Sequence, residues 1–245
     1  MALESNRETT SMKAFILDRY GSADRVRAGE VPDPELREDD VLVQIHAAGV
    51  NLLDSKIRNG EFKRILSYRL PLILGHDVAG VVVRVGSRVR RFTPGDEVYA
   101  RPADGRIGAF AEFIAINEDD VAIKPNALSM EEAASIPLVG LTAWQALIER
   151  ANLKHGQKVL IHAGAGGVGT FAIQLAKHVG VTVATTTSTA NVDLVSGVFR
   201  TATSSSIPMP DTARCSSSTR TSCPRRWSSL HDKPGRCSSS PSSIE

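Results

Sequence analysis

A glycine-rich segment between an expected strand and an expected helix constrains the fold more than any other part of the sequence. The segment reads Ala163-Gly-Ala-Gly-Gly-Val-Gly169, and an apolar run at 158–162 precedes it. Helical spacing of apolar residues follows over about 167–179, and a second apolar run spans 181–186. A strand, a helix and a strand in this order predict a parallel sheet joined by a right-handed crossover.

The glycines of this segment have the spacing of a phosphate-binding turn. Gly164, Gly166 and Gly169 form G-x-G-x-x-G, in which the first glycine permits a tight turn and the second lets the backbone approach a pyrophosphate. The third permits close packing of the helix on the strand. Gly167 and Val168 would offer unpaired amides at the helix N-terminus, where the partial positive charge favours phosphate. A glycine-rich turn without a ligand is the alternative, but the strand–helix–strand setting favours dinucleotide binding.

The second strand ends in hydroxyl side chains and not in a carboxylate. Sites that prefer NAD usually place an acid there to hold the ribose 2′-hydroxyl. This sequence has Thr185-Thr-Thr-Ser-Thr189 instead, and Thr187, Ser188 and Thr189 would accept a 2′-phosphate without repelling it. Asp193 is the alternative acid, but it lies within the next helical pattern and is more typical of a solvent-facing residue. The pattern therefore favours NADP(H), although the sequence shows no basic partner for the phosphate.

The chain before this unit has the signature of an all-β unit. From 13 to about 124, short β-branched runs alternate with Gly, Pro and Asp turns, which predicts a compact β-barrel. Residues 51–59 form the most helical stretch of this part, and Gly60 suits its end. Ser129 and Glu132 then have capping-box spacing and open a helical connector. We therefore expect an α/β unit to follow an all-β unit.

The expected organisation has four parts, which differ sharply in composition. Residues 1–11 read as a polar, disordered extension, 12–128 as the β-barrel domain, 129–195 as a partial dinucleotide-binding domain and 196–245 as a low-complexity tail. Fifteen of the fifty tail residues are Ser and five are Pro. Such a segment cannot bury enough apolar surface to offset the conformational entropy lost on folding. We interpret this disordered tail as an aberrant terminus, from a frameshift, a mispredicted exon or alternative splicing. The alternative is a regulatory Ser/Arg segment.

Charge and cysteine placement exclude several classes of protein. The formal net charge is +2, but residues 196–245 hold seven Lys/Arg against three acids, so the body is slightly acidic and has no nucleic-acid footprint. All three cysteines also lie in 196–245, which fits a reducing cytoplasm. No apolar run reaches the roughly 20 residues that span a bilayer, and the N-terminus lacks a secretory signal. We expect a cytoplasmic protein with no nucleic-acid or membrane partner.

Two further motifs resemble a known family. Gly75-His-Asp-Val-Ala-Gly80, with Gly86 and Val89, resembles the medium-chain alcohol dehydrogenase signature GHExxGxxxxxGxxV. Gly140-Leu-Thr-Ala-Trp144, together with the glycine-rich segment, resembles the quinone oxidoreductase (zeta-crystallin-like) branch. The resemblance covers about 12–195 and implies a GroES-like β-barrel joined to a Rossmann domain, which is incomplete here. In that family the chain's C-terminal part completes the barrel.

The resemblance also implies that no zinc is bound. Zinc-binding members hold catalytic metal through a Cys, a His and a second Cys, and the corresponding positions here are Asn51, His76 and Leu138. One imidazole, with only Asp77 as a neighbouring carboxylate, does not make the three-ligand site that catalytic zinc requires. The span 101–109 contains no Cys for a structural zinc lobe. We expect His76 to be a hydrogen-bonded structural or cleft histidine.

The same resemblance supplies candidate site residues. Asn51 and Asp54 form the N-x-x-D element of zinc-free relatives, in which Asn51 would face the nicotinamide cleft; capping of the following helix is an equally supported role. Together with His76 they are our catalytic candidates. Thr142 resembles the family threonine that contacts the cofactor near its nicotinamide. For the proton donor, Tyr68 and His76 qualify by residue type alone, and water would serve for a quinone.

These features lead to three hypotheses about function. The first is NADPH-dependent hydride transfer, without zinc, to a quinone or an α,β-unsaturated carbonyl, by a possible homo-oligomer. The second is a catalytically inactive, truncated product that acts through association with another chain, because the family fold needs further strands and an open sheet edge favours pairing. The third is an enoyl reductase of the polyketide synthase type.

Overall fold

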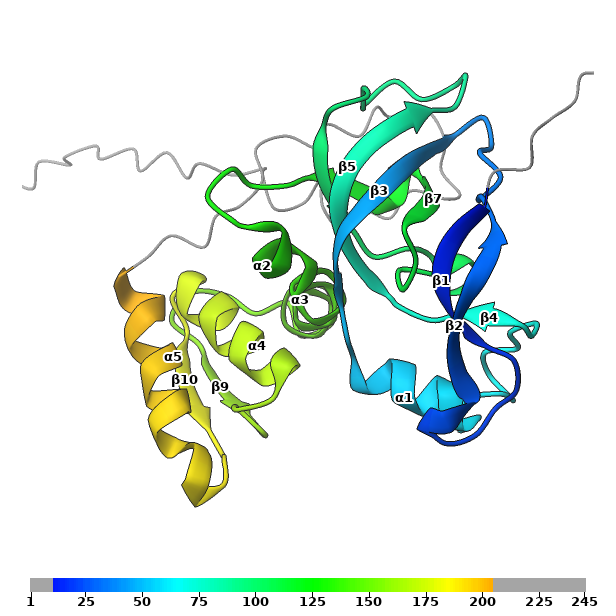
Figure 1. Cartoon of the computed structure of the whole chain (residues 1–245). Coiled ribbons are helices and arrows are strands. Elements are labelled where there is room, and N and C mark those ends of the chain that lie inside the picture. The colour runs from blue at the N-terminus through cyan, green and yellow to red at the C-terminus, as the bar shows by residue number, and fades with distance from the viewer. Residues whose placement is uncertain (1–10, 205–245) are drawn as a thin grey trace, which may run out of the picture.

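The computed structural model describes residues 11–204, and its first part consists of two curled antiparallel sheets (Figure 1). One has the strand order β2-β1-β4 and the other β7-β3-β5-β6-β8. A bridge between Ala14 and Ala111 joins them. The all-β unit expected for this part is confirmed. Its strands are β1 (Ser11–Leu17), β2 (Val26–Pro32), β3 (Asp40–Gly49), β4 (Leu72–Ile73), β5 (Asp77–Val85), β6 (Glu97–Ala100), β7 (Phe113–Asn117) and β8 (Val121–Ile123).

The core of this part forms where β3 and β5 pair antiparallel. Branched side chains of alternate residues, such as Val41, Val43 and Val82, are fully buried in a core formed by the five-stranded sheet. Gly80 marks the closest approach of the two strands, because a Cβ there would lie 2.0 Å from the carbonyl oxygen of Gln44. The second glycine of the Gly75–Gly80 motif is therefore a packing requirement.

A helical segment links the antiparallel sheets to the rest of the chain (Figure 1). The expected capping box of Ser129 and Glu132 is confirmed at its start. α3 packs against α4 on one side and touches β5 on the other, so it lies between the two parts of the molecule. The linking segment contains α2 (Met130–Ala134), α3 (Pro137–Trp144) and the π-helix η4 (Gln145–Arg150). Elsewhere lie α1 (Leu52–Asn59), between β3 and β4, and the short 3-10 helices η1 (Ala23–Arg25), η2 (Asp104–Arg106), η3 (Glu118–Asp120) and η5 (Thr189–Asn191).

The predicted strand–helix–strand unit is confirmed. β9 (Lys158–Ile161) and β10 (Thr182–Thr185) pair in parallel, and α4 (Gly167–His178) connects them. Ile173, Leu175 and Ala176 of α4 are buried with Ile161 in a second core. The expected combination of an all-β unit and an α/β unit thus describes the chain.

The structure differs from the expected domain boundary at residue 195. A helix, α5 (Val192–Ser204), runs through it, so the disorder expected from residue 196 onward is wrong for residues 196–204. Val195 is 5% exposed, and Val198 and Phe199 pack with it against the core around α4. Their spacing of three and four residues is helical, but Ser, Thr and Gly neighbours mask it in the sequence.

The remaining expectations about the chain ends fall largely outside the described residues. Ser11, placed in the extension by the sequence analysis, begins β1. The predicted disorder of 1–10 and of 205–245, and the three cysteines, lie outside the described residues. Within 11–204, no helix is both long enough and apolar enough to cross a membrane.

Candidate functional site

The glycine-rich segment forms the turn between β9 and α4. A Cβ at Gly164 would lie 2.3 Å from Thr185 Oγ1 of β10, and one at Gly169 would lie 2.3 Å from the carbonyl oxygen of Ala163. The sharp turn itself falls on Ala163, whose φ is 56°. The first glycine is therefore needed for its contact with β10, and the third for the packing of α4 on β9.

Gly166 differs from the other two glycines because the space beside it is open. The nearest atom to a Cβ at Gly166 is the carbonyl oxygen of Ala163, at an ordinary 3.4 Å. Gly166 is the N-cap of α4, and Gly166, Gly167 and Val168 are all exposed. Backbone N–H groups in the first turn have no partner within the helix. The turn therefore presents accessible donors and partial positive charge, as an anion-binding helix terminus requires.

The carboxyl end of β10 presents polar side chains near this turn. Ser188 and Thr189 are exposed and Thr187 is half-buried, while Asp193 is exposed on α5. His162, which directly follows β9, lies 3.0 Å from Thr186 through its Nδ1 and the Oγ1 of the threonine. The sequence analysis did not single out His162. Its position directly after the first parallel strand could have indicated it, because cofactor-binding residues follow such strands. An imidazole N–H can donate a hydrogen bond to a phosphate oxygen.

Asp54 and His76 form a buried pair below the start of α1. His76 is fully buried and Asp54 is 3% exposed, and their Nδ1 and Oδ1 atoms are 2.6 Å apart. Asp54 also accepts the backbone N–H of Gly75 (3.2 Å) and that of Asn51 (2.8 Å). The Nε2 atom of His76 has no hydrogen-bond partner within the described part of the chain. This burial supports the hydrogen-bonded, structural role expected for His76, and the pair joins α1 to β5.

Asn51 and Leu138, two of the positions that correspond to zinc ligands, meet at one carboxyl group. Asp77 accepts the Nδ2–H of Asn51 through Oδ2 (2.8 Å) and the backbone N–H of Leu138 through Oδ1 (2.7 Å). Burial raises the pKa of Asp77 to about 6, against hydrogen bonds from Asn51 and Leu138 that lower it. Sequence reasoning treated Asp77 only as a neighbour of His76. Within residues 11–204, no group of three or more His, Cys, Asp or Glu side chains is placed to hold a metal ion.

Thr142 is exposed to solvent, whereas the hydroxyl of Tyr68 is buried. Thr142 is exposed on α3, and its hydroxyl donates to the carbonyl oxygen of Leu138 (2.7 Å) in the same helix. α3 also reaches the glycine-rich turn, because a Cβ at Gly167 would lie 3.2 Å from Val139. The hydroxyl of Tyr68 is buried, and burial raises the pKa of Tyr68 to about 12. Tyr68 is therefore a weak acid, remote in pKa from neutral pH.

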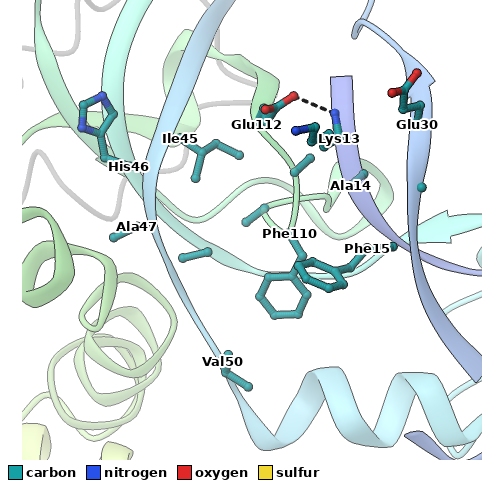
Figure 2. Close-up of a pocket in the computed structure, with 15 residues that line it drawn as sticks. Lys13, Ala14, Phe15, Glu30, Ile45, His46, Ala47, Val50, Phe110 and Glu112 are labelled. Atoms are coloured by element: carbon teal, nitrogen blue, oxygen red, sulfur yellow. Dashed lines mark hydrogen bonds between the residues drawn. The ribbon is translucent and has the colours of Figure 1, made fainter. Parts of the chain in front are cut away.

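A cavity lies on the antiparallel sheets, and the glycine-rich turn takes no part in its lining. It has a volume of about 870 Å³ and lies between β1, β2, β3 and the segment 109–112. Figure 2 shows the rings of Phe15 and Phe110 beside it, with Val50 at one end. Near its polar rim, the backbone N–H of Lys13 donates to Glu112 (2.6 Å). The sequence could not indicate this cavity, because its lining comes from four separate segments.

Comparison with known proteins shows which class of proteins the chain is similar to. Residues 37–126 match the alcohol dehydrogenase GroES-like domain. The chain's homologues are quinone and alkenal oxidoreductases of the medium-chain dehydrogenase/reductase family, so the resemblance is confirmed.

Individual relatives make the comparison more specific. The chain is 45% identical over 195 residues to the 2-methylene-furan-3-one reductase of Solanum lycopersicum, covering 76% of this chain and 50% of that protein. It is 42% identical over 193 residues to the chloroplastic NADPH-dependent alkenal/one oxidoreductase of Arabidopsis thaliana, covering 75% and 50%. The quinone oxidoreductase structure from Coxiella burnetii is 40% identical, with a TM-score of 0.72, over 77% of this chain and 60% of that one. The chain therefore spans about half the length of these two curated relatives.

Proposed function

We propose that the chain binds NADPH at the turn between β9 and α4. We further propose that it serves hydride transfer from NADPH to a quinone or an α,β-unsaturated carbonyl compound without zinc. The observation that carries the proposal is the open, exposed N-terminus of α4 at Gly166, which leaves room for a pyrophosphate against free backbone N–H groups. The reductase and oxidoreductase names of the tomato and Arabidopsis relatives support the same reaction class.

The polar side chains near the carboxyl end of β10 favour NADPH over NADH. A 2′-phosphate placed there would meet the exposed hydroxyls of Ser188 and Thr189 and the imidazole of His162. A carboxylate at that end would repel the phosphate, but the nearest acid along the chain, Asp193, follows only on α5. Hydroxyl O–H and imidazole N–H groups can donate hydrogen bonds to phosphate oxygens.

The residues around Asn51 would orient the reacting groups. When bound, the nicotinamide supplies the hydride. Asn51 would donate an amide N–H to a carbonyl oxygen, and Thr142 on α3 would lie on the same side as the glycine-rich turn. Two of the three positions that correspond to zinc ligands, Asn51 and Leu138, form hydrogen bonds with Asp77 instead. This supports a site without zinc.

Cofactor titration followed by fluorescence tests this proposal. We expect NADPH to bind at least about tenfold more tightly than NADH, because only NADPH can use the groups at the end of β10. Gly166→Ala should weaken NADPH binding by roughly tenfold or more, because its Cβ fills the space left for the pyrophosphate. Gly105→Ala is the matched control, since nothing lies within 4 Å of its added Cβ. Unchanged binding by Gly166→Ala, or no binding at millimolar NADPH, would refute the proposal.

A second candidate function is cofactor binding without turnover. The chain spans about half of its curated relatives, and Leu160 of β9 is 57% exposed on a sheet with two strands among the described residues. NADPH oxidation with a simple quinone and with a crotonyl thioester separates the possibilities. Turnover of the quinone supports the reductase, and faster turnover of the thioester supports the enoyl reductase. Binding with neither turnover supports the non-catalytic role.

A further inference from the structure

One carboxyl group holds together the starts of three elements. Asp77 is the first residue of β5 and is 1% exposed. Its two oxygens accept the backbone N–H of Leu138 in the first turn of α3 and the side-chain N–H of Asn51 at the N-cap of α1. An N–H in the first turn of a helix has no partner within that helix, so Asp77 satisfies a group that would otherwise be unpaired.

The neighbours of Asn51 define the orientation of its side-chain amide, that is, which of them faces the oxygen and which faces Nδ2. At the start of α1, the backbone N–H of Asp54 donates to the backbone carbonyl oxygen of Asn51 (3.0 Å), and the amide oxygen of Asn51 lies on the side of this N–H in the capping box. The Nδ2 end donates to Asp77, because a carboxylate offers only acceptors. With both ends assigned, the second Nδ2–H is the polar hydrogen that remains for a ligand.

We propose that Asp77 is a positioning residue, which fixes the amide of half-buried Asn51 so that its second N–H faces a carbonyl oxygen of the cofactor or the substrate. The role as a donor to a ligand rests on the proposed function. The orientation of the amide rests on its hydrogen bond to Asp77 alone. The two statements can therefore fail separately.

The variant Asp77→Asn tests the orientation with the smallest change of shape. The amide introduced at position 77 can keep its bond to Leu138 only by turning its oxygen toward that N–H, which places its own N–H groups against Nδ2 of Asn51. If Asn51 turns over in response, its Nδ2 faces the backbone N–H of Asp54. Either arrangement opposes two donors, so the Asn51 amide loses its fixed position.

A second variant separates positioning from simple structural support. In the double variant Asn51→Asp/Asp77→Asn, the carboxylate at position 51 accepts from both the amide at position 77 and the N–H of Asp54, so the hydrogen bonds are satisfied again. It has no N–H to offer a ligand. Asp120→Asn is the matched control, because Asp120 is also a carboxyl with a raised pKa that accepts a backbone N–H, that of Ala103 (3.2 Å).

The first measurement is the side-chain amide NMR signal of Asn51 in the whole chain. In the wild type, the hydrogen bond to the carboxylate should displace the chemical shift of one Nδ2 proton. Asp77→Asn should abolish this displacement, and Asp120→Asn should retain it. NADP+ alone and 2-cyclohexen-1-one alone are the two probes, and the second proton should move with whichever supplies the carbonyl oxygen. An Asn51 signal that Asp77→Asn leaves unchanged, or that neither probe moves, would overturn the proposal.

The second measurement is steady-state NADPH oxidation with the same enone. Asp77→Asn should lower kcat by roughly 10- to 100-fold with a smaller effect on KM, because the donor is misplaced in the reacting complex. The double variant should regain the thermal stability of the wild type but not its kcat. Recovery of kcat in the double variant would show that Asp77 is only structural. Absence of turnover in the wild type itself counts against the proposed function, and the NMR result then decides the orientation.

Discussion

The pKa values of single carboxyl groups in this protein are shifted in opposite directions, and the ionisation of Asp77 opposes folding. Burial raises its pKa to about 6 from an ordinary value of 3.8. Its contribution to stability is therefore complete below about pH 4, where both folded and unfolded chains are protonated, and is lost as the pH rises through about 6. The difference in pKa corresponds to roughly 3 kcal/mol.

Comparison of the wild type with Asp77→Asn isolates this effect. Urea unfolding at several pH values between 4 and 7 should show the free energy of unfolding of the wild type falling, relative to the variant, by up to about 3 kcal/mol as the pH rises. Above pH 7 the difference should be constant. A difference that grows in favour of the wild type with rising pH would contradict the assignment.

Asp40 shows the reverse behaviour because a cation faces it. Burial alone would raise its pKa, but two hydrogen bonds from the Arg106 guanidinium (2.7 and 2.6 Å) hold the pKa of Asp40 below its usual value. Arg106 lies in the cysteine-free span 101–109 and also donates to the carbonyl oxygen of Ala115 (3.2 Å). It thus ties η2 to β3 and β7.

Removal of this guanidinium should destabilise the antiparallel sheets. Arg106→Met leaves a carboxylate that is 1% exposed without its counter-ion, and we expect a loss of about 3 kcal/mol at pH 7 in urea unfolding. The double variant Asp40→Leu/Arg106→Met should lose less, because no charge stays buried. A loss below about 1 kcal/mol in the single variant would show that Asp40 is solvated in another way.

At the scale of elements, the contact of α4 with β9 depends on one glycine. A Cβ at Gly169 would lie 2.3 Å from the carbonyl oxygen of Ala163 and 2.9 Å from Cα of Gly164. We expect Gly169→Ala to lower the free energy of unfolding by about 2–3 kcal/mol, because the helix must move off the strand. Gly166→Ala, which meets no atom closer than 3.4 Å, should stay within about 1 kcal/mol of the wild type. Equal losses in the two variants would mean that the turn relaxes freely.

The elements themselves were largely predictable from local patterns. The β9-α4-β10 unit and the capping box at Ser129 follow from spacing within a few residues, and the structure has both. α5 was missed because its buried face consists of Val195, Val198 and Phe199 among small polar residues. Packing against α4, which the sequence does not display, stabilises it.

The candidate site was predictable only in part, for a related reason. Asn51 and the glycines stand out by motif, but Asp77 acquires its role from Asn51, 26 residues away, and Leu138, 61 residues away. His162 and Thr186 are 24 residues apart. Contacts of this kind arise when β5, α3 and the parallel strands meet, and neither periodicity nor spacing along the chain encodes them.

At the scale of the whole molecule, α3 couples the two parts. It carries Leu138, bonded to Asp77 of β5, and Gly140, where a Cβ would lie 3.2 Å from the ring of Phe171 in α4. A ligand held by the first turn of α4 should therefore stabilise the antiparallel sheets as well, provided that the two parts unfold together. The free energy gained at 100 times Kd is about 2.7 kcal/mol.

Hydrogen exchange with and without NADPH measures this coupling directly. In a cooperative molecule, the slowest amides of β3 and β5 should exchange roughly 100-fold more slowly at 100 times Kd, by the same factor as those of β9 and α4. Gly166→Ala, at the same NADPH concentration, should show a much smaller change in both parts. Slower exchange confined to β9, α4 and β10 would mean that the parts unfold separately, and that the bonds through α3 align them without joining their stability.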